Sequence, residues 1–373
     1  MDTKPLPDCG ATPLASPPAE ATAPPPTLPP APAGKCWRVV FVCSLVVFAA
    51  LLFARLGHYA LWGDEAYTAL FGKTIRQTGD TTVLVDGGKN VITAMFGSID
   101  KLTVGVYERS NAPLPAWLIA GSTALLGDNA LAARLLPALL GFLAFALLAW
   151  QTRRARHGAL ACALLAIACC CNVPLLLFMR QARYFGPAMF FVTVITLVYI
   201  KPRVSWRDAA VFTVATVGLY LTHYLSFFVF FVTLAVDYFA FKRRLDGFPV
   251  RRMLALLAPA AAICLVFLIL LNPMQSEWIK DGGMHGKSGD GLREKLMLWW
   301  WQWRDMNTCE HVSFGMLVLT LGCAAWFRDR WLWRGIVAAL VYVTVLTIVT
   351  PQEVKNNTTV ADVRYLAPLL PLL

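Results

Sequence analysis

Long apolar runs recur from one end of the chain to the other, and they restrict its fold more than any other feature. The 373 residues are 58% hydrophobic and only 15% charged, with a mean hydropathy of +0.58. Runs of about 17–25 apolar residues are long enough to cross a ~30 Å hydrocarbon core as α-helices. The sequence therefore predicts an all-α, polytopic integral membrane protein with about nine to ten transmembrane helices. We expect nine of these spans near residues 37–56, 131–150, 159–178, 184–200, 209–223, 225–241, 253–271, 311–327 and 333–349.

The two ends of the chain depart from this pattern. Residues 1–36 are rich in proline and alanine and lack any periodicity, which predicts a disordered cytoplasmic tail. The tail carries too little charge for the basic region of a cleaved signal peptide, so the first span is interpreted as an uncleaved anchor. A tenth span would begin at Tyr365, with only nine residues left to the end at Leu373. Either the sequence is a fragment or the last helix crosses only half of the bilayer. We favour the fragment, and expect residues 37–373 to form one transmembrane domain that is truncated at its last span.

The basic residues predict which way the spans run. The net charge of +11 does not form one patch, as nucleic-acid binding would require, but sorts to one side of the membrane when nine spans alternate. Excess lysine and arginine is typical of cytoplasmic loops. The clusters are Arg153, Arg154 and Arg156; Lys201, Arg203 and Arg207; Lys242, Arg243, Arg244, Arg251 and Arg252; and Arg328, Arg330 and Arg334. The amino terminus is then cytoplasmic, and the opposite face is the outer one.

Two long polar stretches, residues 57–130 and 272–310, lie on this outer face. In the first, the pattern predicts a helix from Asp64 to Gln77, with Asp64 as its N-cap and Gly79 as its stop. A second apolar run, from Pro113 to Leu126, would move the arginine cluster after residue 150 to the outside if it crossed the bilayer. We therefore expect it to be a helix that lies in the outer interface.

The adjacent carboxylates of Asp64 and Glu65 are the main candidates for chemistry. They directly follow the first span, and an ionisable group at the bilayer centre is costly, so acids are placed at the interface or retained for function. Neighbouring helical side chains point about 100° apart, so one acid can act while the other orients it. The alternative is that Asp64 only caps the helix and Glu65 only interacts with the helix dipole.

Two arginines break the charge pattern. Arg180 and Arg183 lie in the short connection RQARYFGP on the outer side, where cations are disfavoured. A phosphate ester would compensate them, because guanidinium groups match phosphate oxygens in a bidentate way. An ion pair with acids of the outer loop is the alternative.

Two aromatic residues, His223 and Tyr224, end a span on the same face. They are candidates for donating hydrogen bonds to a sugar, with simple interfacial aromatics as the alternative. No cofactor is certain. The chain has no HxxxH or CxxC spacing, so we expect no metal-ligand set, although a divalent metal stays open as an alternative.

Four segments together resemble the type C glycosyltransferases that use polyprenyl-phosphate sugars. The resemblance is to family 39, the protein mannosyltransferases and lipid A aminoarabinose transferases, and it covers nearly everything after residue 36. The segments are LWGDEAY, SNAPLPAWLIAGSTALLGDNALAARLLPALLG, RQARYFGPAMF and RYLAPLLPLL, in this order and on one membrane face.

The resemblance implies roles for single residues. An acid of the first outer loop is essential in the family, which corresponds to Asp64 with Glu65 beside it. The arginines of RQARYF and of the closing RY are thought to contact the lipid phosphate, which implies Arg180, Arg183, Tyr184 and Arg364. Where the family often has lysine or histidine before the proline near 113, this chain offers Arg109. Tyr67, in the same motif as the acids, joins His223 and Tyr224 as a predicted substrate-binding residue.

The predicted function is transfer of a sugar from a polyprenyl-phosphate donor to a lipid, glycan or protein acceptor, with inversion. We expect membrane lipids and this donor as partners, and a bacterial inner membrane with the active site on the periplasmic side. A transporter or flippase is the alternative. It would predict charged residues within the spans and inverted repeats, and we expect neither here. A non-catalytic assembly subunit is a third possibility, against which only the intact acids argue.

Overall fold

The computed structural model describes the greater part of the chain. The described residues are 35–79, 84–85, 89–90, 111–154, 157–271, 292–309, 322–323, 326 and 330–349. The proline-rich tail, most of the predicted span 311–327 and the incomplete tenth span lie outside them. The predicted division into tail and membrane domain therefore stays a prediction.

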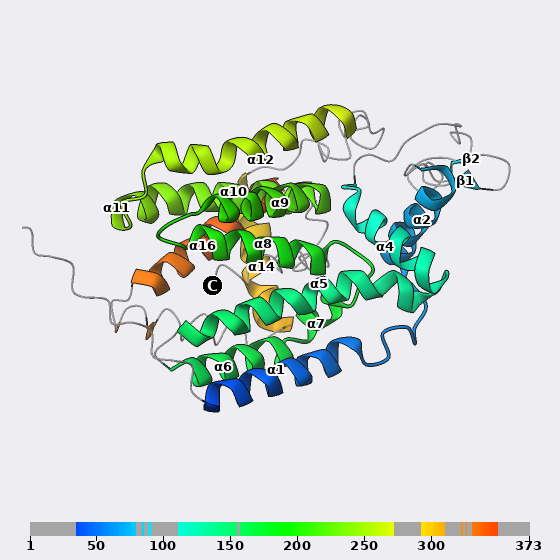
Figure 1. Cartoon of the computed structure of the whole chain (residues 1–373), viewed down its shortest axis with the longest axis horizontal. Helices are drawn as coiled ribbons and strands as arrows, with labels where there is room; N and C mark the ends of the chain where they lie inside the picture. Colours follow the sequence, from blue (N-terminus) through cyan, green and yellow to red (C-terminus); the bar gives the residue numbers. More distant parts are fainter. Residues whose placement is uncertain are drawn as a thin grey trace, which may run out of the picture.

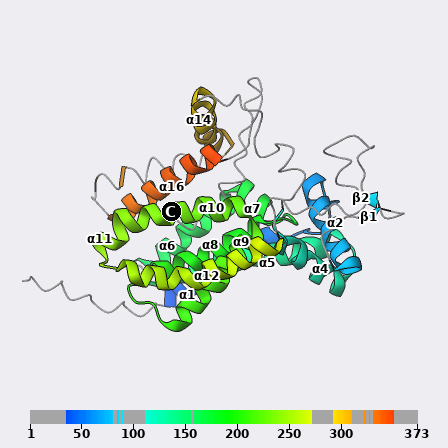
Figure 2. The same ribbon diagram turned by 90° about the horizontal axis from the view of Figure 1, so that it is seen from above.

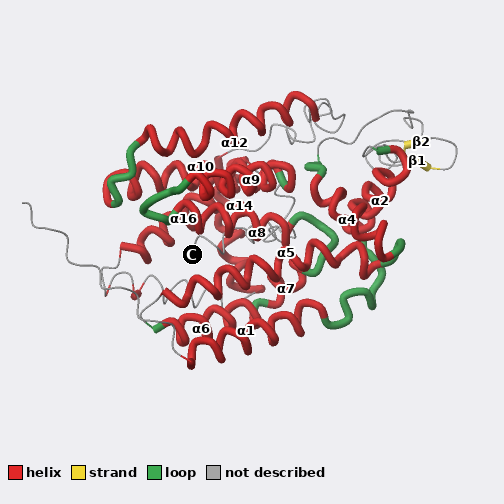
Figure 3. The backbone as a smooth tube through the Cα atoms, in the orientation of Figure 1, coloured by secondary structure: helices red, strands yellow, loops and turns green. Residues whose placement is uncertain are grey.

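The described part is a bundle of roughly aligned helices with two further helices at one end (Figures 1 and 3). The bundle contains α1 (Lys35–Phe53), α5 (Ala130–Gln151), α6 (Gly158–Cys171), α7 (Val173–Met179), α8 (Phe185–Tyr199), α9 (Trp206–Thr222), α10 (Tyr224–Asp237), α12 (Val250–Leu271) and α16 (Arg330–Val349). The end helices are α2 (Gly63–Thr78) and α4 (Leu114–Leu126). The remaining elements are α14 (Leu292–Cys309), the short turns η2 (Thr152–Arg154), η3 (Tyr238–Lys242) and α11 (Arg243–Leu245), and the antiparallel pair β1 (Leu84–Val85) and β2 (Lys89–Asn90).

The surface of the bundle is apolar enough to face lipid. Five described helices are long and apolar enough to cross a membrane, or six if the bent pair α6–α7 is one span. Helix α12 exposes leucines, isoleucines and valines around much of its circumference, for example Ile269 at 68% and Leu254 at 60%. A helix of a soluble protein does not expose apolar side chains around so much of its circumference, because contact of that surface with water is unfavourable. The chain is therefore an integral membrane protein, while the predicted count of nine to ten spans stays a prediction.

Eight of the nine predicted spans correspond to described helices, but one of them is not continuous. The run predicted at 159–178 is split into α6 and α7, which bend by 77°. Asn172 lies at the break, and its side-chain oxygen accepts a hydrogen bond of 2.7 Å from the Leu175 N–H. Pro174 in the first turn of α7 has no N–H to continue the helix. Hydropathy alone predicted one continuous helix here. The local cap and the proline instead start a second helix at this point.

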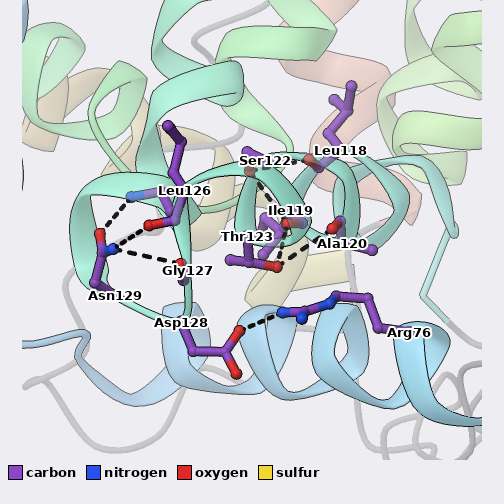
Figure 4. Close-up of polar contacts among 11 residues, drawn as sticks. Arg76, Leu118, Ile119, Ala120, Ser122, Thr123, Leu126, Gly127, Asp128 and Asn129 are labelled. Atoms are coloured by element: carbon purple, nitrogen blue, oxygen red, sulfur yellow. Dashed lines mark hydrogen bonds and ion pairs between the residues drawn. The ribbon is translucent and has the colours of Figure 1, made fainter.

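The end helices α2 and α4 pack on each other and on the start of α5. The turn between α4 and α5 holds them: Arg76 of α2 pairs with Asp128 at 2.5 Å, and Asn129 accepts a hydrogen bond of 2.9 Å from the Ala132 N–H at the start of α5 (Figure 4). The exposed ion pair contributes at most about 1 kcal/mol. Both end helices were predicted as helices of the outer loop. At 13 residues α4 is about 20 Å long, too short to cross the bilayer, but its place in the interface stays a prediction.

A buried charge cluster lies at the end of the bundle opposite α2 and α4. Arg334 of α16 makes a bidentate pair with Asp237 of α10, at 3.0 and 2.7 Å, and Tyr199 at the end of α8 donates to the same carboxylate at 2.7 Å. The expectation that the predicted spans hold no charged residues is therefore wrong. Arg134, Asp237 and Arg334 all lie in apolar helices, where each is tolerated because an opposite charge neutralises it.

Helix α14 lies on the other side of α16 from the rest of the bundle (Figure 2). Trp299 donates a hydrogen bond of 3.1 Å to Thr344 of α16, and Trp303 packs beside it with the rings 5.8 Å apart. Trp300 is 61% exposed. The described tryptophans therefore divide between packing on α16 and facing outward.

Helices α5 and α8 approach each other closely at Gly186. A Cβ atom placed on this glycine would lie 2.1 Å from the Pro137 carbonyl oxygen and 3.2 Å from the Gly141 nitrogen. Small residues that let helix backbones approach are typical of membrane bundles. Because Gly186 belongs to the RQARYFGP segment, this contact sets the distance of that segment from α5.

We expect Gly186→Ala to destabilise the protein by about 1–3 kcal/mol, because the added methyl group must push two backbones apart. Gly121→Ala in α4 is the matched control, since nothing lies within 4 Å of its Cβ position. That change should be neutral or stabilising by about 0.5–1 kcal/mol. Thermal unfolding of the purified proteins in detergent measures both, and equal midpoints for the two variants would contradict the close contact.

Candidate active site

A buried ion pair between Glu65 and Arg134 forms the base of the candidate site. The guanidinium binds the carboxylate in a bidentate way, with Nε donating to Oε1 at 2.9 Å and Nη2 to Oε2 at 2.6 Å. Its other three N–H groups donate to the carbonyl oxygens of Leu56, Tyr59 and Ala60, at 2.8–3.1 Å. All five donors of Arg134 are therefore used. The link from α1 to α2 is thereby tied to α5.

Glu65 also holds the connection between α7 and α8. Its Oε1 accepts a hydrogen bond of 2.7 Å from the Ala182 N–H, and its Oε2 lies 3.5 Å from the Trp62 N–H at the start of α2. The residue is 1% exposed. With four donors around two buried oxygens, Glu65 has little capacity left to accept a proton from a substrate. The geometry favours a positioning role for it.

The adjacent acid, Asp64, points elsewhere. Its Oδ2 lies 2.5 Å from Nη1 of Arg183, in the connection that Glu65 holds. The Asp64 side chain is 43% exposed and that of Arg183 is 16% exposed. The expectation that Asp64 is the N-cap of the helix is wrong, because α2 begins at Gly63 after an N-cap at Trp62. The predicted stop is confirmed: Gly79 adopts a left-handed φ of 79°.

An aromatic stack continues the site beyond Arg183. The guanidinium carbon lies 5.2 Å from the centre of the Tyr184 ring. Tyr184 in turn stacks on His223, with the two rings 3.8 Å apart and nearly parallel. His223 joins α9 to α10, and its Nδ1 accepts a hydrogen bond of 3.2 Å from the Ser226 N–H. The structure thus brings four predicted residues from three parts of the chain together: Asp64, Arg183, Tyr184 and His223.

Arg180 lies apart from this group. It donates to the carbonyl oxygens of Leu51 and Ala54, at 3.2 and 2.5 Å, at the end of α1. A cation is favourable at a helix C-terminus, where carbonyl groups lack partners. The Arg180 side chain thus caps the C-terminus of α1, although it lies only two positions before Ala182, which binds Glu65.

Tyr67 follows Asp64 by about one turn of α2 and packs against Phe71 and Ala116. Burial raises the pKa of its phenol above the ordinary value, and the negative charge of Asp64 raises it further. The phenol therefore stays protonated at neutral pH and remains able to donate a hydrogen bond. It lies on the helix that carries the acids, as the motif suggested.

Other predicted groups cannot be placed. Arg109 and Arg364 lie outside the described residues, so their predicted contact with phosphate stays a prediction. Among the described residues, no group of three or more histidine, cysteine, aspartate or glutamate side chains could hold a metal ion.

Solved structures of ArnT from Cupriavidus metallidurans resemble this chain. The structure of ArnT bound to undecaprenyl phosphate aligns with a TM-score of 0.59 at 19% identity, over 91% of this chain and 59% of ArnT. The apo structure aligns with a TM-score of 0.57 at 17% identity, over 90% of this chain and 58% of ArnT. ArnT is a lipid A aminoarabinose transferase of the type C glycosyltransferases. This chain has the type C glycosyltransferase fold.

The likeness concerns the fold, because the identity is below 20%. No protein-family profile matches the sequence, and comparison with curated proteins finds no significant match. The chain spans about three fifths of the length of ArnT. The resemblance of four sequence segments to this class is therefore supported by the path of the backbone through nearly all of this chain.

Sequence reasoning missed Arg134, the residue that organises the candidate site. A signal was present: a single arginine within the predicted span 131–150 is costly in lipid unless it is paired. The sequence did not show which of the 22 acidic residues is its partner. Glu65 lies 69 positions away, so only the fold reveals the pair.

We expect Glu65→Ala to destabilise the protein by about 3–5 kcal/mol, because it leaves the Arg134 charge buried without a partner. Asp64→Ala is the matched control at the neighbouring position. It removes a half-exposed pair and should cost less than about 1 kcal/mol. Thermal unfolding in detergent separates the two, and a small loss for both would mean that Glu65 does not hold the site.

Proposed function

We propose that this protein is a membrane glycosyltransferase that moves a sugar from a polyprenyl-phosphate donor to an acceptor hydroxyl. The observation that carries the proposal is the Asp64–Arg183 pair, a carboxylate and a guanidinium in contact at the α2 end of a type C fold. One ArnT structure contains undecaprenyl phosphate, which supports a lipid of this class as the donor carrier. The sugar, hexose or pentose, and the acceptor are not specified by these residues.

The proposed reaction is a single displacement with inversion. Asp64 accepts the proton of the acceptor hydroxyl, and the acceptor oxygen forms a bond to the anomeric carbon of the sugar. The bond from that carbon to the phosphate oxygen breaks, and its electron pair leaves with the polyprenyl phosphate. Arg183 stabilises the charge that develops on the departing phosphate. A phosphate leaves readily, so the step requires no general acid.

The Asp64–Arg183 contact has a consequence for this mechanism. To bind Arg183, the donor phosphate must either share the guanidinium with the Asp64 carboxylate or displace that carboxylate from it. Nη1 of Arg183 contacts Asp64, and a guanidinium has five N–H donors, so others can bind phosphate oxygens. Asp64 is the more exposed partner and therefore the one that can move. Donor binding would release the carboxylate for the acceptor, so the base becomes available only when a donor is present.

The remaining residues receive supporting roles in the proposal. Glu65 orients α2 through Arg134 and is a positioning residue. Tyr184 and His223 form one wall next to Arg183, and Tyr67 is a hydrogen-bond donor beside Asp64. Arg180 ends α1, while Arg109 and Arg364 stay candidates for further phosphate contacts. We place the site on the periplasmic side of a bacterial inner membrane, on the strength of the charge bias between loops.

A transporter or flippase is the second candidate, and one observation favours it. Charged residues do lie within the apolar helices, as such a protein would require. In the described part, however, Arg134 is saturated by five hydrogen bonds and Arg334 is paired with Asp237. These charges join helices to each other. Transfer of labelled sugar to an acceptor, measured in the same vesicles as lipid translocation, distinguishes the two functions.

We expect Asp64→Asn to abolish sugar transfer, because an amide cannot accept the proton. The same variant should bind undecaprenyl phosphate more tightly than the wild type, since Asp64 no longer competes for Arg183 and no longer repels the phosphate. Both are measured on purified protein, with radiolabelled polyprenyl-phosphate sugars for transfer and undecaprenyl phosphate in detergent for binding. Wild-type turnover in the variant would remove Asp64 as the base. Weaker phosphate binding would contradict the competition.

We expect Arg183→Lys to reduce donor use about ten- to a hundred-fold, as expected for the loss of a charge-assisted hydrogen bond worth roughly 1.5–3 kcal/mol. Arg183→Gln should be worse, because the charge is lost as well. Arg180→Gln is the control: it should lower thermal stability through the end of α1 and leave undecaprenyl phosphate affinity nearly unchanged. If Arg180→Gln were the variant that lost phosphate binding, the two arginines would have exchanged roles.

A further inference from the structure

Two tyrosine hydroxyls lie buried without a hydrogen-bond partner close to the candidate site. Tyr220 ends α9 and is 7% exposed, and Tyr224 begins α10. Their rings are 5.1 Å apart. Neither hydroxyl has a hydrogen-bond partner in the described structure. A buried hydroxyl without a partner is destabilising, whereas phenylalanine would fill the same space without that cost.

The side chains packed around these phenols do not explain their hydroxyl groups. They are apolar: Leu114 from α4, Phe227 from α10, and Cys264 and Leu271 from α12. Buried tyrosines at the other end of the bundle do have partners, and Tyr199 donates to Asp237 at 2.7 Å. Tyr238, at the far end of the bundle, donates to the Phe248 carbonyl oxygen at 3.0 Å. The unpartnered phenols are therefore a property of the end of the bundle that carries α4, not of tyrosines in this fold generally.

Their place in the chain connects them to the site. Tyr224 directly follows His223, and Tyr220 precedes it by about one helical turn. His223 stacks on Tyr184, which is adjacent to Arg183. Leu114, which packs with the phenols, belongs to the helix that packs on α2 and its acids. Both phenols thus lie within about one helical turn of His223, at the α9–α10 junction.

We infer that the hydroxyls of Tyr220 and Tyr224 bind hydroxyl groups of the donor sugar and contribute to the choice of sugar. The inference rests on the proposed function. A phenol both donates and accepts a hydrogen bond, which matches a sugar hydroxyl. The prenyl chain offers only carbon atoms, and the phosphate is assigned to Arg183. The transferred sugar is bonded directly to that phosphate, whereas the acceptor hydroxyl is expected at Asp64.

The test compares two lipids on the same purified variants, Tyr220→Phe and Tyr224→Phe. The probes are undecaprenyl phosphate and a panel of undecaprenyl-phosphate sugars that includes mannose and 4-amino-4-deoxyarabinose. Each variant should bind the preferred sugar-linked lipid about two- to ten-fold more weakly than the wild type, as for loss of a neutral hydrogen bond. Affinity for undecaprenyl phosphate itself should not change. The thermal midpoint without ligand should be equal to or above that of the wild type.

Tyr238→Phe is the matched control, because it removes a hydroxyl that does have a partner. It should lower the thermal midpoint and change the affinity for neither lipid. Equal losses for both lipids, no loss for either, lower stability of the ligand-free Tyr220→Phe protein, or a change confined to acceptor KM would each overturn the inference. Failure of the wild type to bind undecaprenyl phosphate would instead overturn the proposed function and the inference with it.

Discussion

The buried pair of Glu65 and Arg134 is the interaction on which the rest of the site depends. It joins the link between α1 and α2, the first turn of α2, helix α5 and the connection before α8. Removing either partner would leave a buried charge uncompensated, so the pair fixes geometry strongly even though its net contribution to stability is small. The position of Asp64 opposite Arg183 is a consequence of this clamp, because α2 cannot rotate without breaking it.

Neighbouring residues of the same type acquire different roles through their surroundings. Glu65 is buried and its oxygens are saturated, while Asp64 is 43% exposed and contacts one guanidinium. The same division separates Arg180, which ends α1, from Arg183, which lies next to the aromatic stack. In both cases one member of the pair binds backbone groups, while the other takes part in the Asp64–Arg183 ion pair.

Much of the architecture is readable from the sequence. Eight of the predicted apolar runs correspond to described helices, because burying a helix in lipid requires a long apolar stretch that few other folds produce. The local capping signal also predicted the helix end at Gly79 correctly. Two sequence signals gave wrong predictions. Hydropathy merged α6 with α7 across Asn172, and the capping pattern assigned Asp64 as an N-cap, although tertiary contact with Arg183 determines the orientation of its side chain.

The sequence by itself determined the membrane class, the approximate helix ends and the residue types at the site, since these follow from local composition and spacing. It did not determine which charges meet. Glu65 and Arg134 are 69 positions apart, and Asp64 and Arg183 are 119 apart. Pairing over such separations depends on how helices cross, and that is decided by close contacts such as Gly186 against Pro137. Only the tertiary structure could therefore show that one acid is buried against Arg134 while the other lies half-exposed beside Arg183.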